Sequence, residues 1–211
     1  MRLFAESPQI FLEENCAPGL FKPNGIDLNI NTTPGYFSFF SRPVTNIKPS
    51  SVINAQTAFE TIISSKYAIQ TNYLRTMTDK VAAQNYKARN FDFCCFSGTF
   101  SKRSVSGLLF HSGFLTIDFD HIENVCSLKR MLIENPSFNT VLAFTSPSGD
   151  GLKWIVEIDI TLYTHALWFY TIAAFLKANY KVEADPSGKD VSRCCFLPCD
   201  PEAYINPKYL A

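Results

Sequence analysis

Two aspartates stand at the end of an apolar run near the middle of the chain. Residues 114–120 read FLTIDFD, and the acids are Asp118 and Asp120. Side chains two residues apart on a strand point to the same face, so the two carboxylates are expected side by side. Adjacent ionised carboxylates repel each other unless a cation lies between them, and carboxylate oxygens select Mg²⁺ or Mn²⁺. The pair therefore predicts a divalent-metal site of the kind used in nucleotidyl transfer.

A third acid would complete the set of metal ligands. Asp185 follows the apolar-alternating segment 180–184, which we expect to return as a strand beside the acidic one. Asp190 is the close alternative. Two-metal transfer needs carboxylates that hold cations ~3.5–4 Å apart. We therefore predict that Asp118, Asp120 and Asp185 bind the metal and act in catalysis.

A glycine-rich turn, SPSGDGLK at 146–153, follows the acidic strand. Its hydroxyls, backbone N–H groups and lysine are suited to binding a triphosphate. The predicted nucleotide-binding residues are Ser146, Ser148, Gly149, Gly151, Lys153, Lys189 and Arg193. Lys153 and Arg193 are also predicted to act in catalysis by neutralising phosphate charge. The alternatives are an ordinary hairpin turn and, around Lys189 and Asp190, a surface ion-pair cluster.

A basic turn at 97–103 follows the strand-like run 91–96, and the two resemble part of a hairpin with a basic tip. Lys102 and Arg103 at this tip are candidates for nucleic-acid contact, and the alternative is a solvated loop. Two histidines, His111 and His121, flank the acidic strand, and we interpret both as structural or peripheral.

The composition limits which partners and which cellular compartment the protein can be expected to have. The 211 residues carry 19 basic and 19 acidic side chains, so the net charge is zero and any nucleic-acid contact must use a local basic patch. Seven cysteines, two pairs of them adjacent within apolar runs, indicate free thiols in a reducing compartment. The opening lacks a hydrophobic signal core, and no apolar run approaches the ~20 residues that span a bilayer. We therefore expect a cytoplasmic protein that does not contact membranes.

The elements that must position these residues can be read from the apolar spacing. Residues 1–35 are rich in Pro, Asn and Gly and predict an irregular lead-in, so the folded domain is placed at 36–211. We divide it into an N-terminal α/β module, 36–110, and a core, 111–211. The module is predicted to contain a strand at 36–42 and helices at 55–67 and 72–83.

The second half has the more regular pattern. It predicts, in order, a strand at 114–120, a helix at 124–134, strands at 140–145 and 152–158, a helix at 162–179 and a last strand at 182–185 or 194–197. This βαββαβ order indicates an α+β fold of the ferredoxin-like or RNA-recognition-motif (RRM) plan, an antiparallel sheet with two helices on one face. The acidic strand is expected to lie centrally, beside the strand that ends at Ser146.

The order of motifs resembles the archaeo-eukaryotic primase superfamily, and more closely its VirE N-terminal, primase-like family. The similarity runs over 36–209, and its motifs are FSGTF at 96–100, HSG at 111–113, DFDH at 118–121, SPSGDGLK at 146–153, SGKDVSR at 187–193 and DPEAY at 200–204. The resemblance implies a primase or primase-polymerase core of a mobile-element or phage replication system. It also implies a single-stranded DNA template, nucleoside triphosphates, Mg²⁺ or Mn²⁺, and a separate or fused helicase. The superfamily usually has a histidine where this chain has Lys153.

Three functions remain open at this point. The first is a template-dependent nucleotidyltransferase that uses the metals and the glycine turn. The second is a catalytically silent primase-like module that binds single-stranded nucleic acid. The third is a metal-dependent nuclease, which is less favoured because it needs no triphosphate-binding turn. Loss of the acids should abolish nucleotide incorporation by an enzyme and leave the strand affinity of a binding module unchanged.

Overall fold

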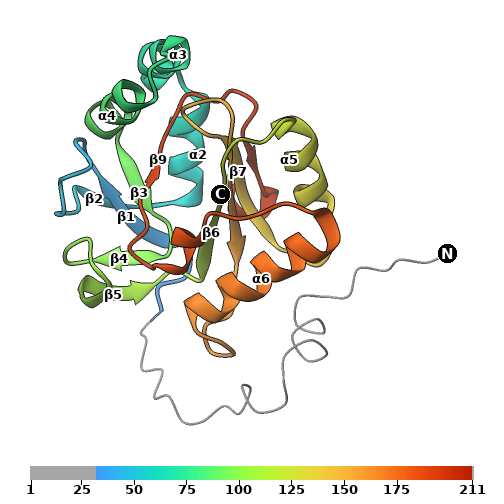
Figure 1. Ribbon diagram of the computed structural model, residues 1–211. Helices are drawn as coiled ribbons and strands as arrows, with labels where there is room; N and C mark the ends of the chain where they lie inside the picture. Colours follow the sequence, from blue (N-terminus) through green and yellow to red (C-terminus); the bar gives the residue numbers. More distant parts are fainter. Residues whose placement is uncertain (1–31, 211) are drawn as a thin grey trace.

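A computed structural model of the chain describes residues 32–210. They form a mixed α+β fold with two four-stranded antiparallel sheets and a two-stranded hairpin (Figure 1). The predicted α+β class is confirmed. The predicted lead-in 1–35 falls almost wholly outside the described residues. No helix among residues 32–210 is long and apolar enough to cross a membrane.

The first sheet has the strand order β2-β1-β3-β9. Its strands are β1 (Tyr36–Phe40), β2 (Ser51–Asn54), β3 (Phe93–Cys95) and β9 (Cys195–Phe196). The predicted strands at 36–42 and 91–96 are thus confirmed in shorter form. β4 (Gly98–Phe100) and β5 (Leu108–His111) pair antiparallel, so a hairpin forms here. Its first arm was predicted wrongly, because β4 lies within the predicted turn 97–103, whereas β3 pairs with β1 and β9 in the first sheet.

Three helices lie between β2 and β3. α2 (Ala55–Ile63) begins after Asn54, whose side chain accepts a hydrogen bond from the Thr57 N–H. The single helix predicted at 72–83 is wrong, because the segment forms two helices, α3 (Ala68–Thr76) and α4 (Lys80–Asn90). The break has a local cause, since the Asp79 carboxylate caps α4 by accepting from the Val81 and Ala82 N–H groups.

The second sheet and its helices follow the predicted order closely. The elements are β6 (Phe114–Phe119), α5 (Val125–Glu134), β7 (Thr140–Thr145), β8 (Leu152–Glu157) and α6 (His165–Tyr180). α5 and α6 begin directly after Asn124 and Thr164, whose side chains accept hydrogen bonds from N–H groups of the first turn. α6 therefore begins three residues later than the spacing of its apolar residues suggested.

The strand order differs from the expectation in two respects. The sheet runs β10-β7-β8-β6, so the acidic strand β6 is at an edge and β8 separates it from β7. The fourth strand is β10 (Tyr204–Ile205), which pairs with β7. Of the two segments expected to supply the last strand, 182–185 forms none, and β9 pairs with β3 in the other sheet. Segment 182–185 still reaches β6, because the Asp185 N–H donates to the Asp118 carbonyl oxygen at 2.8 Å.

The second sheet is buried on both faces. One face packs against α5 and α6, through residues such as Ile117, Trp154 and Phe175. The other face, through Phe114 and Ile155, packs against α2 and the first sheet. Figure 1 shows this arrangement, with α5 and α6 on one side of the sheet and β1, β3 and α2 on the other. Because side chains alternate along a strand, Asp118 is on the face of β6 that also carries Phe114, toward the first sheet.

Candidate functional site

The centre of the candidate site is a buried ion pair between two neighbouring strands. Asp118 on β6 and Lys153 on β8 are directly opposite each other in the antiparallel register. The Lys153 ammonium contacts the Asp118 carboxylate, and both residues are buried, 9% and 3% exposed respectively. Opposite charges directly across a strand pair are favourable, and burial removes the competing water. The register of the sheet therefore brings together two residues that the sequence predicted for one site.

Arg193 joins a second acid to this pair. One of its terminal nitrogens lies 3.2 Å from an Asp118 carboxylate oxygen and 2.8 Å from an Asp185 carboxylate oxygen. The two carboxylates thus converge on one guanidinium. Asp190, the alternative third acid, is exposed and instead caps its own turn by accepting from the Ser192 N–H at 2.8 Å and the Ser192 hydroxyl at 2.9 Å. The geometry therefore favours Asp185 over Asp190.

The surroundings of Asp185 favour its charged form. Burial alone would raise the pKa of this carboxyl. The Ser187 backbone N–H, 2.9 Å from a carboxylate oxygen, and the Arg193 guanidinium outweigh that effect, so the pKa lies below its usual value. The pKa of Arg193 is raised, since Asp118 and Asp185 outweigh the opposing effect of burial. Both groups are held as ions.

The site supplies some of the ligands that a divalent cation needs. Asp118 and Asp185 supply the hard carboxylate oxygens that Mg²⁺ or Mn²⁺ prefers, and Arg193 already places a positive charge between them. Asp120, the third predicted ligand, is exposed just beyond the end of β6 and makes no ion pair with another described residue. Within residues 32–210, no group of three or more His, Cys, Asp or Glu side chains is placed to hold a metal ion.

The glycine turn lies at the same end of β6 and β8. The Ser146 N–H donates to the Gly151 carbonyl, and the Gly149 N–H donates to the Ser146 carbonyl, so the turn is closed by its own backbone. A Cβ on Gly151 would lie 2.5 Å from the Phe119 carbonyl oxygen, so only glycine lets the turn approach β6 this closely. Ser148, at the tip, is exposed.

Two basic residues from the helices α3 and α4 complete the site, and sequence reasoning did not assign either to it. The Arg75 guanidinium donates to the Ser146 and Pro147 carbonyls, at 3.3 Å each, and so connects α3 to the glycine turn. Lys87 on α4 has a lowered pKa because burial and the positive charge of Lys153 outweigh the nearby acids. The only sequence signal for them was a helical segment rich in basic residues and poor in acidic ones.

Lys189, Lys102 and Arg103, all within the described part of the chain, form no ion pair with this cluster. Lys189 is exposed, with its ammonium 5.9 Å from the centre of the Tyr170 ring. Lys102 is exposed at the turn between β4 and β5. Arg103 folds back instead, donating to the Val44 carbonyl at 2.7 Å and covering the Phe93 ring.

A cavity of about 740 Å³ lies at the opposite end of β6 and β8, where Phe114 and Glu157 line it.

A buried pair of histidines supports the segment that carries Asp185 and Arg193. His111 Nδ1 accepts from the Gly113 N–H at 3.0 Å, so its Nε2 carries the proton and donates to His165 Nδ1 at 3.1 Å. His165 Nε2 in turn donates to the Gly188 carbonyl at 3.2 Å. Burial lowers the pKa of His111 to about 3, with a further contribution from His165, and lowers that of His165 to about 4. Both rings are therefore neutral, and the structural interpretation of His111 is confirmed.

The other histidine next to the acidic strand is peripheral, as expected. His121 is exposed, and its Nδ1 lies 2.7 Å from an Asp150 carboxylate oxygen at the edge of the glycine turn. Asp150 also accepts the Ile122 N–H through its backbone carbonyl at 2.7 Å. These contacts fix the segment after β6 against the turn.

Residues 86–205, more than half of the chain, match the model of a protein family described as "BT4734-like, N-terminal domain". The chain belongs to this family. The matched region of the BT4734-like domain begins within α4 and ends with β10, so it includes Asp118, Lys153, Asp185 and Arg193. Searches of the curated proteins and of the solved structures gave no match.

Proposed function

We propose that this BT4734-like domain is a nucleotidyltransferase of primase type, which adds nucleotides from triphosphates to a strand on a single-stranded DNA template. The observation that carries the proposal is the meeting of Asp118, Asp185 and Arg193 with Lys153 at one end of β6 and β8. They come from separate parts of the chain and meet beside the glycine turn. Paired carboxylates with adjacent cations are the groups that phosphoryl transfer requires.

The order of elements from β6 to α6 also supports the proposal. The strands β6, β8 and β7 lie in that order with α5 and α6 on one face, which is the arrangement of the first three strands of an RRM-like sheet. Asp118 is on the opposite face. The resemblance to the VirE N-terminal primase-like family and to the RRM-like primase core remains part of this proposal, as do a mobile-element or phage setting and a helicase partner.

In the proposed reaction, the oxygen of a 3′-hydroxyl forms a bond to the α-phosphorus of the incoming triphosphate. The bond from that phosphorus to the bridging oxygen of the β-phosphate breaks, pyrophosphate leaves, and the hydroxyl proton passes to water. Lys153 and Arg193 bind the phosphates and neutralise the charge that develops on them. Asp118 and Asp185, with Asp120 at the exposed edge, would hold Mg²⁺ or Mn²⁺, which stabilises phosphate charge as a Lewis acid.

One observation favours the second candidate, a silent module that binds single-stranded nucleic acid. The Asp118 carboxylate is already neutralised by Lys153 and Arg193, and Arg193 also neutralises Asp185. Two buried acids that are paired in this way can belong to a structural ion-pair network. The two functions differ in what removal of the acids does, so one set of variants separates them.

The test is primer synthesis on single-stranded DNA with labelled triphosphates and either Mn²⁺ or Mg²⁺. Asp120→Ala is the first variant because this side chain is exposed and makes no ion pair that the fold depends on. Asp118→Asn with Asp120→Ala is the second variant. Glu134→Gln, an exposed acid at the end of α5, is the matched control. We expect labelled products from the wild type and the control, and a loss of about 100-fold or more in both site variants.

Two results would overturn the enzyme proposal. If the folded wild type makes no product with either metal but binds single-stranded DNA, and the site variants bind it equally well, the domain is a binding module. If the labelled strand is shortened instead of extended, the same acids serve a nuclease. Circular dichroism of each variant shows whether a loss of product reflects chemistry or unfolding.

A further inference from the structure

The helical hairpin formed by α3 and α4, residues 68–90, concentrates positive charge in a chain whose net charge is zero. It carries four basic residues, which are Arg75, Lys80, Lys87 and Arg89. Its single acid, Asp79, uses its carboxylate to cap α4. The hairpin thus has a net charge of +3, and the rest of the chain balances it with an excess of acids.

The hairpin is anchored through α3, where Thr71 and Leu74 are buried, and its outer surface is exposed. None of the residues of α4 is fully buried, although Ala83 and Tyr86 pack against the core. On α3, Ile69 and Tyr73 are 83% and 55% exposed. The Tyr73 ring is supported from one side by Tyr86 of α4, with ring centres 4.9 Å apart. An exposed, supported aromatic ring among basic side chains is the combination on which unpaired bases stack.

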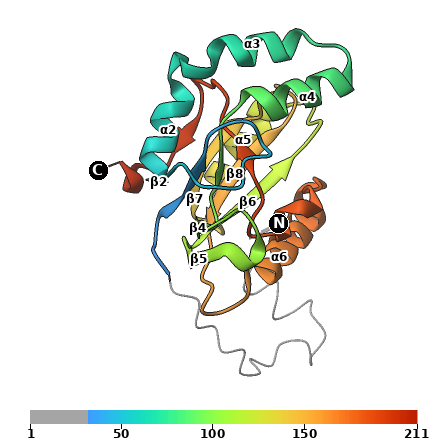
Figure 2. The same cartoon turned by 90° about the vertical axis from the view of Figure 1, so that its left-hand side faces the viewer.

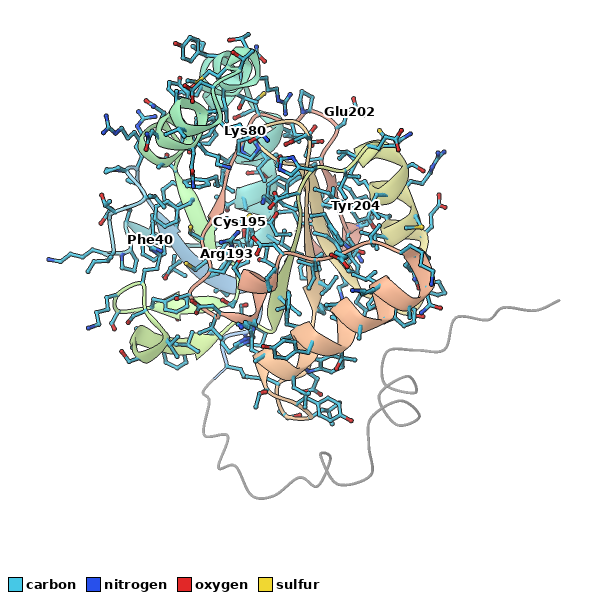
Figure 3. All side chains as sticks on the ribbon, viewed as in Figure 1. Phe40, Lys80, Arg193, Cys195, Glu202 and Tyr204 are labelled. Carbon is cyan, nitrogen blue, oxygen red and sulfur yellow. The ribbon has the colours of Figure 1, made fainter. Side chains whose placement is uncertain are left out.

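The position of the hairpin connects it to the candidate site. Figure 2 shows α3 and α4 running side by side across one end of the molecule, toward the side that holds α6. Arg75 contacts the glycine turn, and Lys87 is close enough to Asp118 and Asp120 for their charges to affect its pKa. Figure 3 labels Lys80 on this hairpin, together with Arg193 in the site. A strand lying on the hairpin would therefore pass close to the acids.

We propose that the α3–α4 hairpin is the surface that binds the single-stranded template, with Lys80, which is on the same side of α4 as Lys87, on its phosphates and Tyr73 stacked on a base. The occupant is a nucleic acid because the hairpin offers cations without free acids, which complements a phosphate backbone. It is single-stranded because stacking on Tyr73 requires an unpaired base. This inference rests on the proposed function only in naming the bound strand as the template. It also moves the interface away from Lys102 and Arg103, since Arg103 is used within the fold.

The test is the affinity for a fluorescein-labelled single-stranded oligonucleotide and for its duplex, measured by anisotropy over a range of salt without triphosphate or metal. Lys80→Ala is expected to weaken binding and lower the salt slope by about 0.7, which is the contribution of one phosphate contact to a single strand. Tyr73→Ala is expected to weaken binding about five-fold or more, while Tyr73→Phe keeps the ring and the affinity. The control, Lys48→Ala with Lys102→Ala, removes two exposed lysines elsewhere and is expected to leave affinity and slope unchanged.

Several results overturn the inference. These are no binding by the wild type, equal binding by the hairpin variants, or a loss confined to the Lys48 and Lys102 variant. Equal loss of affinity for duplex and single strand in Tyr73→Ala would refute the stacking role and the single-strand assignment. Loss of synthesis in Asp120→Ala with unchanged strand affinity would support the proposed reaction independently, so failure of either proposal can be recognised alone.

Discussion

Acidification should destabilise this domain through its two buried histidines, well above the pH at which carboxylates titrate. The pKa values of His111 and His165 in the fold are about 3 and about 4, against 6.5 for an exposed histidine. At pH values between the folded and the unfolded pKa of each histidine, the unfolded chain therefore binds more protons than the folded one. The stability that the neutral pair contributes is complete above pH ~6.5 and is lost as the pH falls toward ~3.

The size of the loss follows from these values. At pH ~5 an unfolded histidine is almost fully protonated, whereas both buried rings remain neutral. Protonation of the unfolded chain therefore lowers the unfolding free energy at pH ~5, relative to pH ~7, by ~2 kcal/mol for each histidine and ~4 kcal/mol for the pair. The average domain is stable by only ~5–15 kcal/mol, so the effect should be large enough to measure.

The assay is urea unfolding at the two pH values, for the wild type and for His111→Asn with His165→Asn. The double variant should be less stable at neutral pH and should lose most of the pH dependence. His121→Asn is the matched control, because this third histidine is exposed and its replacement leaves the buried pair intact. A wild type equally stable at both pH values, or a double variant that keeps the full dependence, would refute the assignment of the neutral hydrogen-bonded pair.

Two further predictions concern the site. Asp118→Asn should cost about 3–5 kcal/mol of unfolding free energy, because it leaves the buried Lys153 ammonium without a carboxylate. Lys153→Met should cost ~1–3 kcal/mol, because Asp118 keeps its contact with Arg193. Urea unfolding of both variants checks this order, and equal losses would contradict it. Gly151→Ala should lower the unfolding free energy by ~1–3 kcal/mol, because its Cβ would clash with the backbone of β6. Ser148→Ala, at the exposed tip of the same turn, should leave the stability nearly unchanged. Thermal unfolding of the two variants tests this difference.

Much of the second half of the fold could be predicted because its signals are local. The apolar spacing located β6, α5, β7, β8 and α6 to within a few residues. The strand order could not be read in this way, since alternation fixes which side chains share a face but not which strands are neighbours. β9 and β10 are two residues long, which is too short for any periodic pattern. The break between α3 and α4 was marked only by Asp79, a single capping residue.

The residues of the candidate site that could be predicted were those whose type and place in the chain were informative. Asp118, Asp185, Lys153 and Arg193 were chosen as charged residues at the ends of expected strands and turns, and the structure joins them by ion pairs. The contact of Arg75 with the glycine turn, and the effect of the site charges on Lys87, depend on how α3 and α4 pack in the fold. In sequence, they were indistinguishable from a solvated helix face. The pairing of His111 with His165 likewise depends on the tertiary position of α6.

The ion pairs also constrain how the proposed enzyme would bind its substrates. Lys153 and Arg193 currently neutralise the Asp118 carboxylate, so a divalent cation would have to compete with both for it. A triphosphate offers the two basic side chains another anionic partner, and their movement toward it would free the carboxylates. Under the proposed function, triphosphate and metal should therefore each strengthen the binding of the other, as reciprocal linkage requires. If the proposed relation to the primase superfamily holds, Lys153 stands where that superfamily usually has a histidine, and the coupling would depend on the residue in which this chain departs from the pattern.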